Sequence, residues 1–199
     1  FLVGGARDSA SVRARVDNLR MLLKARGGNV ALWRARRLRR CLATAMVVES
    51  PGRMGMLLHS PSHAPGVEPG ALSRVSRAVG EAALSRGLTY VQALCDVGTA
   101  DAAMLETAGL RHLADLVYLH LDLVGAGPID TWTSHSEGLS WRAYGEYDDA
   151  ELADLILSTY EGSLDCPGLV GLRTMEDVIA AHKSGTRFRP SCWWILQRN

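Results

Sequence analysis

The chain has 199 residues, enough for one ordinary domain or for one small domain and part of another. Its 22 basic and 21 acidic residues leave a formal charge of +1, so no overall field would attract nucleic acid or an anionic membrane surface. No apolar run approaches the roughly 20 residues of a membrane span, and the four cysteines form no CxxC pair. These features favour a globular protein of a reducing cytoplasm that binds no metal.

The first 60 residues predict a helix followed by an antiparallel meander of three strands. These elements are expected at residues 8–26, 29–33, 41–50 and 53–60. The run RARRLRR separates the first two strands, and a charge run of this kind usually marks a solvated face. We therefore interpret these arginines as a solvated hairpin turn.

A loop rich in proline and glycine leads into a second amphipathic helix. Its apolar residues begin at Leu72 and recur at helical spacing until Gly87, which predicts the end of the helix. Residues 88–97 predict a buried strand, residues 101–108 a short helix, and residues 110–123 a final strand or strand pair. This order predicts an α/β fold with a mixed, mostly antiparallel sheet flanked by helices.

The order of elements over residues 8–123 resembles the GNAT superfamily, the acyl-CoA-dependent N-acetyltransferases. In that family a strand, a loop of pattern Q/R-x-x-G-x-G/A and a helix N-terminus hold the pyrophosphate of coenzyme A. Counted back from Gly87, the loop here reads VEPGAL, and Gly70 falls on a family glycine. The resemblance implies that acetyl-CoA contacts Val67, Gly70, Ala71, Leu72 and Ser73. A plain helix cap with a proline in the first turn is the alternative interpretation.

The resemblance also assigns roles near the reacting group. The strand at residues 53–60 would supply Leu57, Leu58 and His59 as the wall for the pantetheine arm. An imidazole can exchange a proton near neutral pH, so His59 is the candidate base. In the stretch AMLETAGL, Leu105 takes the place where the family often has a tyrosine, and leucine cannot donate a proton.

The function that the resemblance implies is acetyl transfer from acetyl-CoA to a primary amine of a small molecule. The alternative is a noncatalytic GNAT-like module that supports a partner domain or binds a ligand without turnover. Leu105 and the departures of VEPGAL from the family pattern favour this alternative. A metal site is not expected, because Pro61 interrupts the helical spacing of His59 and His63.

From Leu139 onward the pattern starts again. A strand, two helices and a second strand are expected at residues 139–147, 148–160, 174–183 and 192–196, with Thr174 as a helix cap. STYEGSLDCPGL followed by RTMEDVIAAHKSG resembles the start of the second half of tandem, mycothiol synthase-like GNAT proteins. That resemblance implies that Tyr160 and Glu161 approach the amine substrate, with a surface-capping role as the alternative.

The expected organisation is a GNAT-like domain at residues 1–123, a linker at 124–138, and the truncated start of a second GNAT-like domain at 139–199. The second part lacks the strands that should cover its apolar faces, so we expect it to dock on the first domain or on another copy in a homodimer. Trp193 and Trp194 alternate along the last strand, so at most one can face a cleft while the other packs into the core.

Overall fold

The computed structural model describes residues 16–17, 20–21, 24, 30–117, 119, 138–163, 166–185 and 188–198. Most of the helix predicted at 8–26 and most of the linker predicted at 124–138 lie outside these residues. The elements are β1 (Val30–Arg37), β2 (Arg40–Ser50), β3 (Met54–His59), α2 (Pro69–Ser85), β4 (Tyr90–Gln92), α3 (Ala100–Thr107), β5 (Leu139–Ala143), α4 (Asp149–Tyr160), η1 (Pro167–Leu169), α5 (Met175–Gly185), η2 (Pro190–Cys192) and β6 (Trp194–Arg198).

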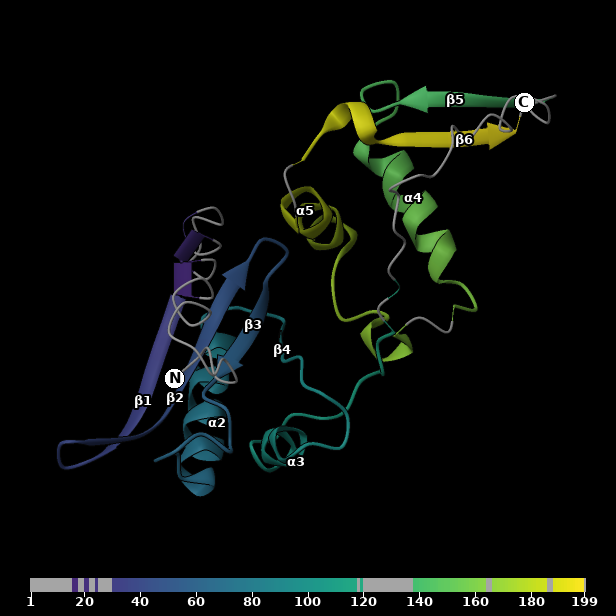
Figure 1. Cartoon of the computed structure of the whole chain (residues 1–199). Coiled ribbons are helices and arrows are strands. Elements are labelled where there is room, and N and C mark those ends of the chain that lie inside the picture. The colour runs from purple at the N-terminus through teal and green to yellow at the C-terminus, as the bar shows by residue number, and fades with distance from the viewer. Residues whose placement is uncertain are drawn as a thin grey trace, which may run out of the picture.

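The larger sheet has the strand order β1-β2-β3-β4. The first three strands form the predicted antiparallel meander, whereas β4 runs parallel to β3. A parallel neighbour requires a crossover, and α2 supplies it while lying along one face of the sheet (Figure 1). The molecule is therefore mixed α/β, with a mostly antiparallel sheet flanked by helices.

The core of this region lies between α2 and the sheet. Leu72, Val75, Val79 and Ala83 recur every three or four residues and form the buried stripe of α2. They pack against Ala43, Ala45, Val47 and Leu57, which alternate with residues of the opposite face along β2 and β3. The spacing of apolar residues thus determines both elements and brings their buried faces together.

Two predicted strands differ from the structure. The strand predicted at residues 88–97 is only Tyr90–Gln92, and Leu94 and Val97 beyond it are exposed. The strand predicted at 110–123 is absent from its described part, residues 110–117 and 119. A strand is stable only where a neighbour completes its hydrogen bonds, and β4 pairs with β3 over three residues. The apolar residues at 88–97 predict a strand, but a local pattern does not determine how many of these residues pair with β3.

The second region contains β5 and β6, which form a two-stranded antiparallel sheet, together with α4 and α5. β5 begins at Leu139 as predicted but ends before the predicted limit at residue 147, and β6 lies further along the chain than the predicted residues 192–196. Thr174 caps α5 as predicted, because its Oγ1 accepts a hydrogen bond from the Asp177 N–H at 3.3 Å. The two tryptophans differ in burial as the alternation predicts, since Trp193 packs against the core of this region while Trp194 is 54% exposed. Both nevertheless line one hollow beside α4, so the prediction that at most one of them can face a cleft is wrong.

Helix α5 contacts the turn between β2 and β3. Arg53 donates two hydrogen bonds to Asp177 Oδ2, at 2.8 Å and 2.6 Å. A Cβ added to Gly52 would lie 2.2 Å from the Asp177 carbonyl oxygen, so the two backbones touch. Nearby, the Arg173 guanidinium lies over the ring of Tyr90 in β4, 5.6 Å from its centre. The second region therefore docks on the first, which is one of the two arrangements expected from its uncovered apolar faces.

Candidate functional site

A cavity opens where β3 and β4 separate. The two strands pair only from Met54 to Met56, and beyond that point no other described segment pairs with β3 on this side. The cavity holds about 260 Å³ and is lined by Leu57, Leu58, His59, Pro61, Leu94, Cys95, Asp96 and Asp101. It is the space left by the early end of strand pairing, and it brings polar side chains of three segments together.

The three residues predicted on β3 lie in the wall of this cavity. Leu57 is almost fully buried, and Leu58 and His59 are half-buried. His59 Nδ1 lies 3.0 Å from the carbonyl oxygen of Ser60, which can only accept a hydrogen bond. In the neutral ring Nδ1 therefore carries the proton, and Nε2 keeps the basic lone pair.

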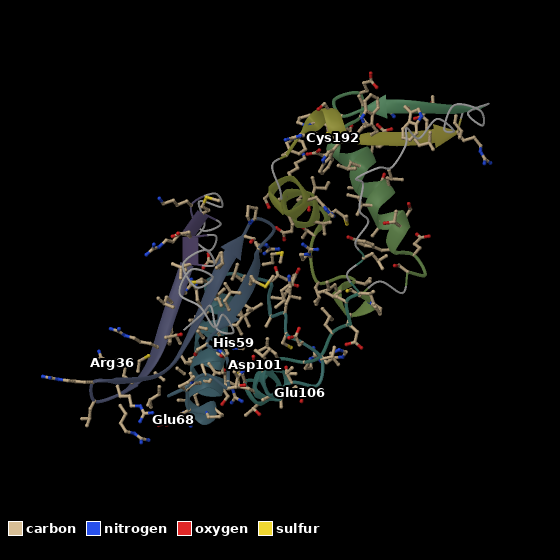
Figure 2. The ribbon with its side chains drawn as sticks, viewed as in Figure 1. Arg36, His59, Glu68, Asp101, Glu106 and Cys192 are labelled. Carbon is tan, nitrogen blue, oxygen red and sulfur yellow. The ribbon has the colours of Figure 1, made fainter. Side chains whose placement is uncertain are left out.

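Asp101, in the first turn of α3, lies beside His59 (Figure 2). Its Oδ1 accepts a 2.7 Å hydrogen bond from the backbone N–H of Ser62, which ties α3 to the loop after β3. Partial burial works to raise the pKa of Asp101, but hydrogen bonding from Ser62 and the charges of the two nearby imidazoles outweigh it. The pKa is lowered overall, so Asp101 is a carboxylate at neutral pH.

Cys95 supplies a neutral thiol to the same cavity. Partial desolvation raises the pKa of this thiol, and the carboxylates of Asp101 and Asp96 raise it further. A thiol rather than a thiolate is a poor nucleophile but can donate a proton. Sequence reasoning missed Cys95, Asp96 and Asp101. Their positions could have indicated a site: Cys95 and Asp96 follow a strand that is parallel to its neighbour, and Asp101 lies at the start of the next helix.

The residues predicted at the cofactor loop surround the N-terminus of α2. Val67 packs against the core, Gly70 is exposed, and the side chains of Ala71, Leu72 and Ser73 are buried within the helix packing. Buried side chains cannot touch a ligand at the helix mouth. For these three residues only the backbone remains available.

At the N-terminus of α2, one backbone N–H is left without a hydrogen-bond acceptor among the described residues. Glu68 is the N-cap residue, and its carbonyl accepts from both Ala71 and Leu72 at 2.9 Å. Pro69 has no N–H, whereas the Gly70 N–H has no partner among the described residues. The side chain of Glu68 makes no capping hydrogen bond, so the Gly70 amide stays open at the N-terminus of the helix.

Three other predicted positions lie outside the cavity wall. Leu105 is 5% exposed and packs in the main core, so it neither donates a proton nor lines the cavity. Tyr160 ends α4 and Glu161 follows as its C-cap. The structure does not bring these two residues together with His59 in the cavity.

A second hollow of about 310 Å³ lies in the other region, between α4 and β6. Its lining is mainly aromatic and aliphatic: Tyr147, Leu152, Leu155, Cys192, Trp193, Trp194 and Ile195. Desolvation raises the pKa of Tyr147, so its phenol stays neutral. This hollow offers apolar contact but lacks the imidazole and carboxylates of the first cavity.

Within the described part of the chain, no three His, Cys, Asp or Glu side chains come together as a metal site. None of the helices in the described ranges is long and apolar enough to span a bilayer. No family model, curated protein or solved structure matches this chain.

Proposed function

We propose that the protein transfers an acetyl group from acetyl-CoA to a primary amine of a small molecule in the cytoplasm. The observation that carries this proposal is the cavity between the separating strands β3 and β4, with His59 in its wall. The peptide groups of β3 that face this opening have no ladder partner in the described ranges of the chain, so an amide N–H is available to a thioester carbonyl. A cavity of about 260 Å³ suits the reacting end of the two substrates rather than the whole cosubstrate.

His59 is the general base of this proposal. Nε2 accepts a proton from the attacking ammonium group, directly or through one water, while Nδ1–H stays bonded to Ser60. The nearby carboxylate of Asp101 stabilises the imidazolium that forms. Attack of the amine on the thioester carbon forms the C–N bond, and the C–S bond then breaks. The nitrogen loses its second proton as the amide forms, and this proton replaces the one that Cys95 gives to the leaving thiolate.

The departing thiolate needs a proton, and Leu105 cannot supply it. Cys95 is the neutral acid of the cavity wall that can do so, because its S–H is retained at neutral pH. Because burial and the nearby carboxylates raise the pKa of Cys95, it is a weaker acid than an ordinary thiol, and proton transfer to the leaving sulfur runs uphill. The acid of the proposed reaction thus comes from the segment after β4 instead of from α3.

The test is a thiol-release assay with acetyl-CoA and a panel of primary amines. His59→Asn keeps an N–H that can reach the Ser60 carbonyl but removes the base, and we expect a loss of about 10² to 10⁴ in kcat. His63→Asn, in the exposed loop nearby, is the matched control and should keep its activity. Equal rates for both variants would contradict the role of His59.

A noncatalytic ligand-binding module is the second candidate. It is favoured by the buried position of Leu105 and by the single open amide at the mouth of α2. Calorimetry separates the two candidates. Acetyl-CoA binding without thiol release, for any amine in the panel, would support the binding module and contradict the transferase.

A further inference from the structure

The turn between β1 and β2 is a surface that the proposed function does not use. Five of the chain's 22 basic residues lie between positions 34 and 40. Residues 36–40 are all exposed, and Leu38 at the apex is 93% exposed. In Figure 1 this end of the hairpin projects beyond the outline of the other elements, and none of its residues lines the cavity that holds His59. The turn is therefore separate from the candidate site.

Leu38 has a backbone conformation that leucine rarely adopts. The turn is a two-residue loop, Leu38 and Arg39, between the paired residues Arg37 and Arg40. Leu38 has φ +53°, and a positive φ at the first position of a two-residue hairpin turn is usually supplied by glycine. Leucine at this position strains the backbone, and its exposed side chain gains nothing from burial in the fold. This combination of strain and exposure points to a contact outside the chain.

Arginines surround the apex on both faces of the hairpin. Side chains alternate between the two faces along a strand, so Arg34 and Arg36 lie on one face and Arg37 lies on the other with its partner Arg40. Among the described residues, the only carboxylate within ion-pair distance of these arginines is that of Glu68, 3.9 Å from Arg37. The apex thus carries an excess of positive charge that the described part of the chain does not neutralise.

An apolar tip surrounded by cations suits the surface of an anionic membrane. A leucine can enter the boundary between headgroups and acyl chains, while long arginine side chains keep their guanidinium groups at the level of the headgroups. The arginines alone would suit a nucleic acid equally well. Leu38, however, offers a nucleic acid neither an aromatic ring that stacks on bases nor a donor for base edges. The residue at the apex therefore favours the lipid surface.

We propose that the β1–β2 turn binds an anionic membrane surface, with Leu38 inserted among the headgroups and the arginines placed against them. The contact is shallow, because Leu38 is the one apolar residue among positions 36–40. Because the whole chain has a formal charge of only +1, the attraction comes from this local cluster and is weakened by salt.

Co-sedimentation of the full chain with vesicles at low ionic strength tests the charged part of this contact. The probes are vesicles of phosphatidylcholine alone and vesicles with one part phosphatidylserine to three parts phosphatidylcholine. We expect the parent to bind only the second kind. One arginine near an anionic surface changes affinity about fivefold, so Arg39→Gln with Arg40→Gln should weaken binding at least about tenfold.

The matched control removes the same charge from exposed positions elsewhere. Arg111→Gln with Arg198→Gln should change vesicle binding by less than about twofold. Equal weakening in the two double variants would show a general charge effect and overturn the proposal. A parent that does not bind the phosphatidylserine vesicles also overturns it.

Leu38→Gly separates insertion from folding. Glycine adopts φ +53° without strain, so this variant should keep or raise the melting temperature while vesicle binding weakens severalfold. Leu116→Gly removes a leucine that is 51% exposed elsewhere and should leave vesicle binding unchanged. Unchanged vesicle binding in Leu38→Gly would contradict the insertion of the apex.

A short DNA duplex tests the other polyanion, with fluorescence anisotropy as the measurement. We expect the parent to bind the duplex more weakly than the phosphatidylserine vesicles. Tighter binding of the duplex that depends on Arg39 and Arg40 but not on Leu38 would identify a nucleic acid as the partner and overturn the membrane contact.

Discussion

The two regions of the molecule bury apolar strands with different numbers of neighbours. In the larger sheet β2 lies between β1 and β3 under α2, and Ala43, Ala45 and Val47 have no exposed surface. In the smaller sheet each strand has one neighbour, and Trp141 and Trp194 on its outer face remain 55% and 54% exposed. Burial therefore follows the number of neighbouring elements rather than the hydrophobicity of the strand itself.

The same comparison explains how each region is held together. The core of the first region contains a continuous layer of aliphatic residues between α2 and the sheet. The second core is a small aromatic cluster in which Trp193 packs edge-on against Tyr144 and Phe188, with ring centres 6.0 Å and 5.1 Å apart. We infer that the second region depends on its contact with the first, through α5, for part of its stability.

The largest expected effect comes from the main core. Leu72 has no exposed surface and lies at the centre of the α2 stripe, so Leu72→Ala should lower the free energy of unfolding by about 2–5 kcal/mol. Leu152→Ala in the smaller core should cost less, because fewer buried residues surround it. Urea denaturation measures both. Equal losses for the two variants, in one shared transition, would show that the two cores unfold as one unit.

The contact between the regions should respond strongly to one glycine. Gly52 has φ +82° and touches the Asp177 carbonyl oxygen, so Gly52→Ala must both strain the turn and push α5 away. Gly87→Ala is the matched control, because Gly87 has φ +98° but open space around it. We expect Gly87→Ala to cost about 1–2 kcal/mol and Gly52→Ala to cost more.

Thermal unfolding measures this difference, and small-angle scattering shows whether the regions separate. A larger radius of gyration is expected for Gly52→Ala alone. Identical melting temperatures and radii for the two variants would contradict a close contact at this turn.

The smallest expected effect is the pH dependence of the ion pair between Arg53 and Asp177, which joins the two regions. A hydrogen bond from Arg53 lowers the pKa of Asp177, so protonation is disfavoured in the folded protein. A lowered pKa in the folded state contributes stability above the unfolded pKa of roughly 4, and this contribution is lost as the pH falls through the folded pKa. The melting temperature of the parent should exceed that of Asp177→Asn at pH 6, and the difference should shrink as the pH falls below about 4.

The exposed Asp154 on α4 gives the control for this measurement, since Asp154→Asn should not change the melting temperature at either pH. A difference between the parent and Asp177→Asn that persists unchanged at pH 3 would show that the carboxylate is not the group that titrates.

Much of the fold was predictable because short-range patterns determine it. The stripe that starts at Leu72 predicted α2, Thr174 predicted the start of α5, and alternation predicted the different environments of Trp193 and Trp194. In the candidate site, the resemblance to GNAT proteins predicted three residues of β3: Leu57, Leu58 and His59. The structure places all three in the wall of one cavity. Their role in acetyl transfer stays a prediction.

The sequence by itself determined that α2, α4 and α5 are helices and which faces of them are apolar, because these depend on residues three or four positions apart. Only the tertiary structure decided where β3 and β4 separate, and that separation brings Cys95 and Asp101 to His59. It also placed one extra residue in β2 between Cys41 and Ala43, which shifts the register of β1 and β2 between Ala35 and Arg36. Both outcomes depend on the register between segments distant in the chain, which no local spacing records.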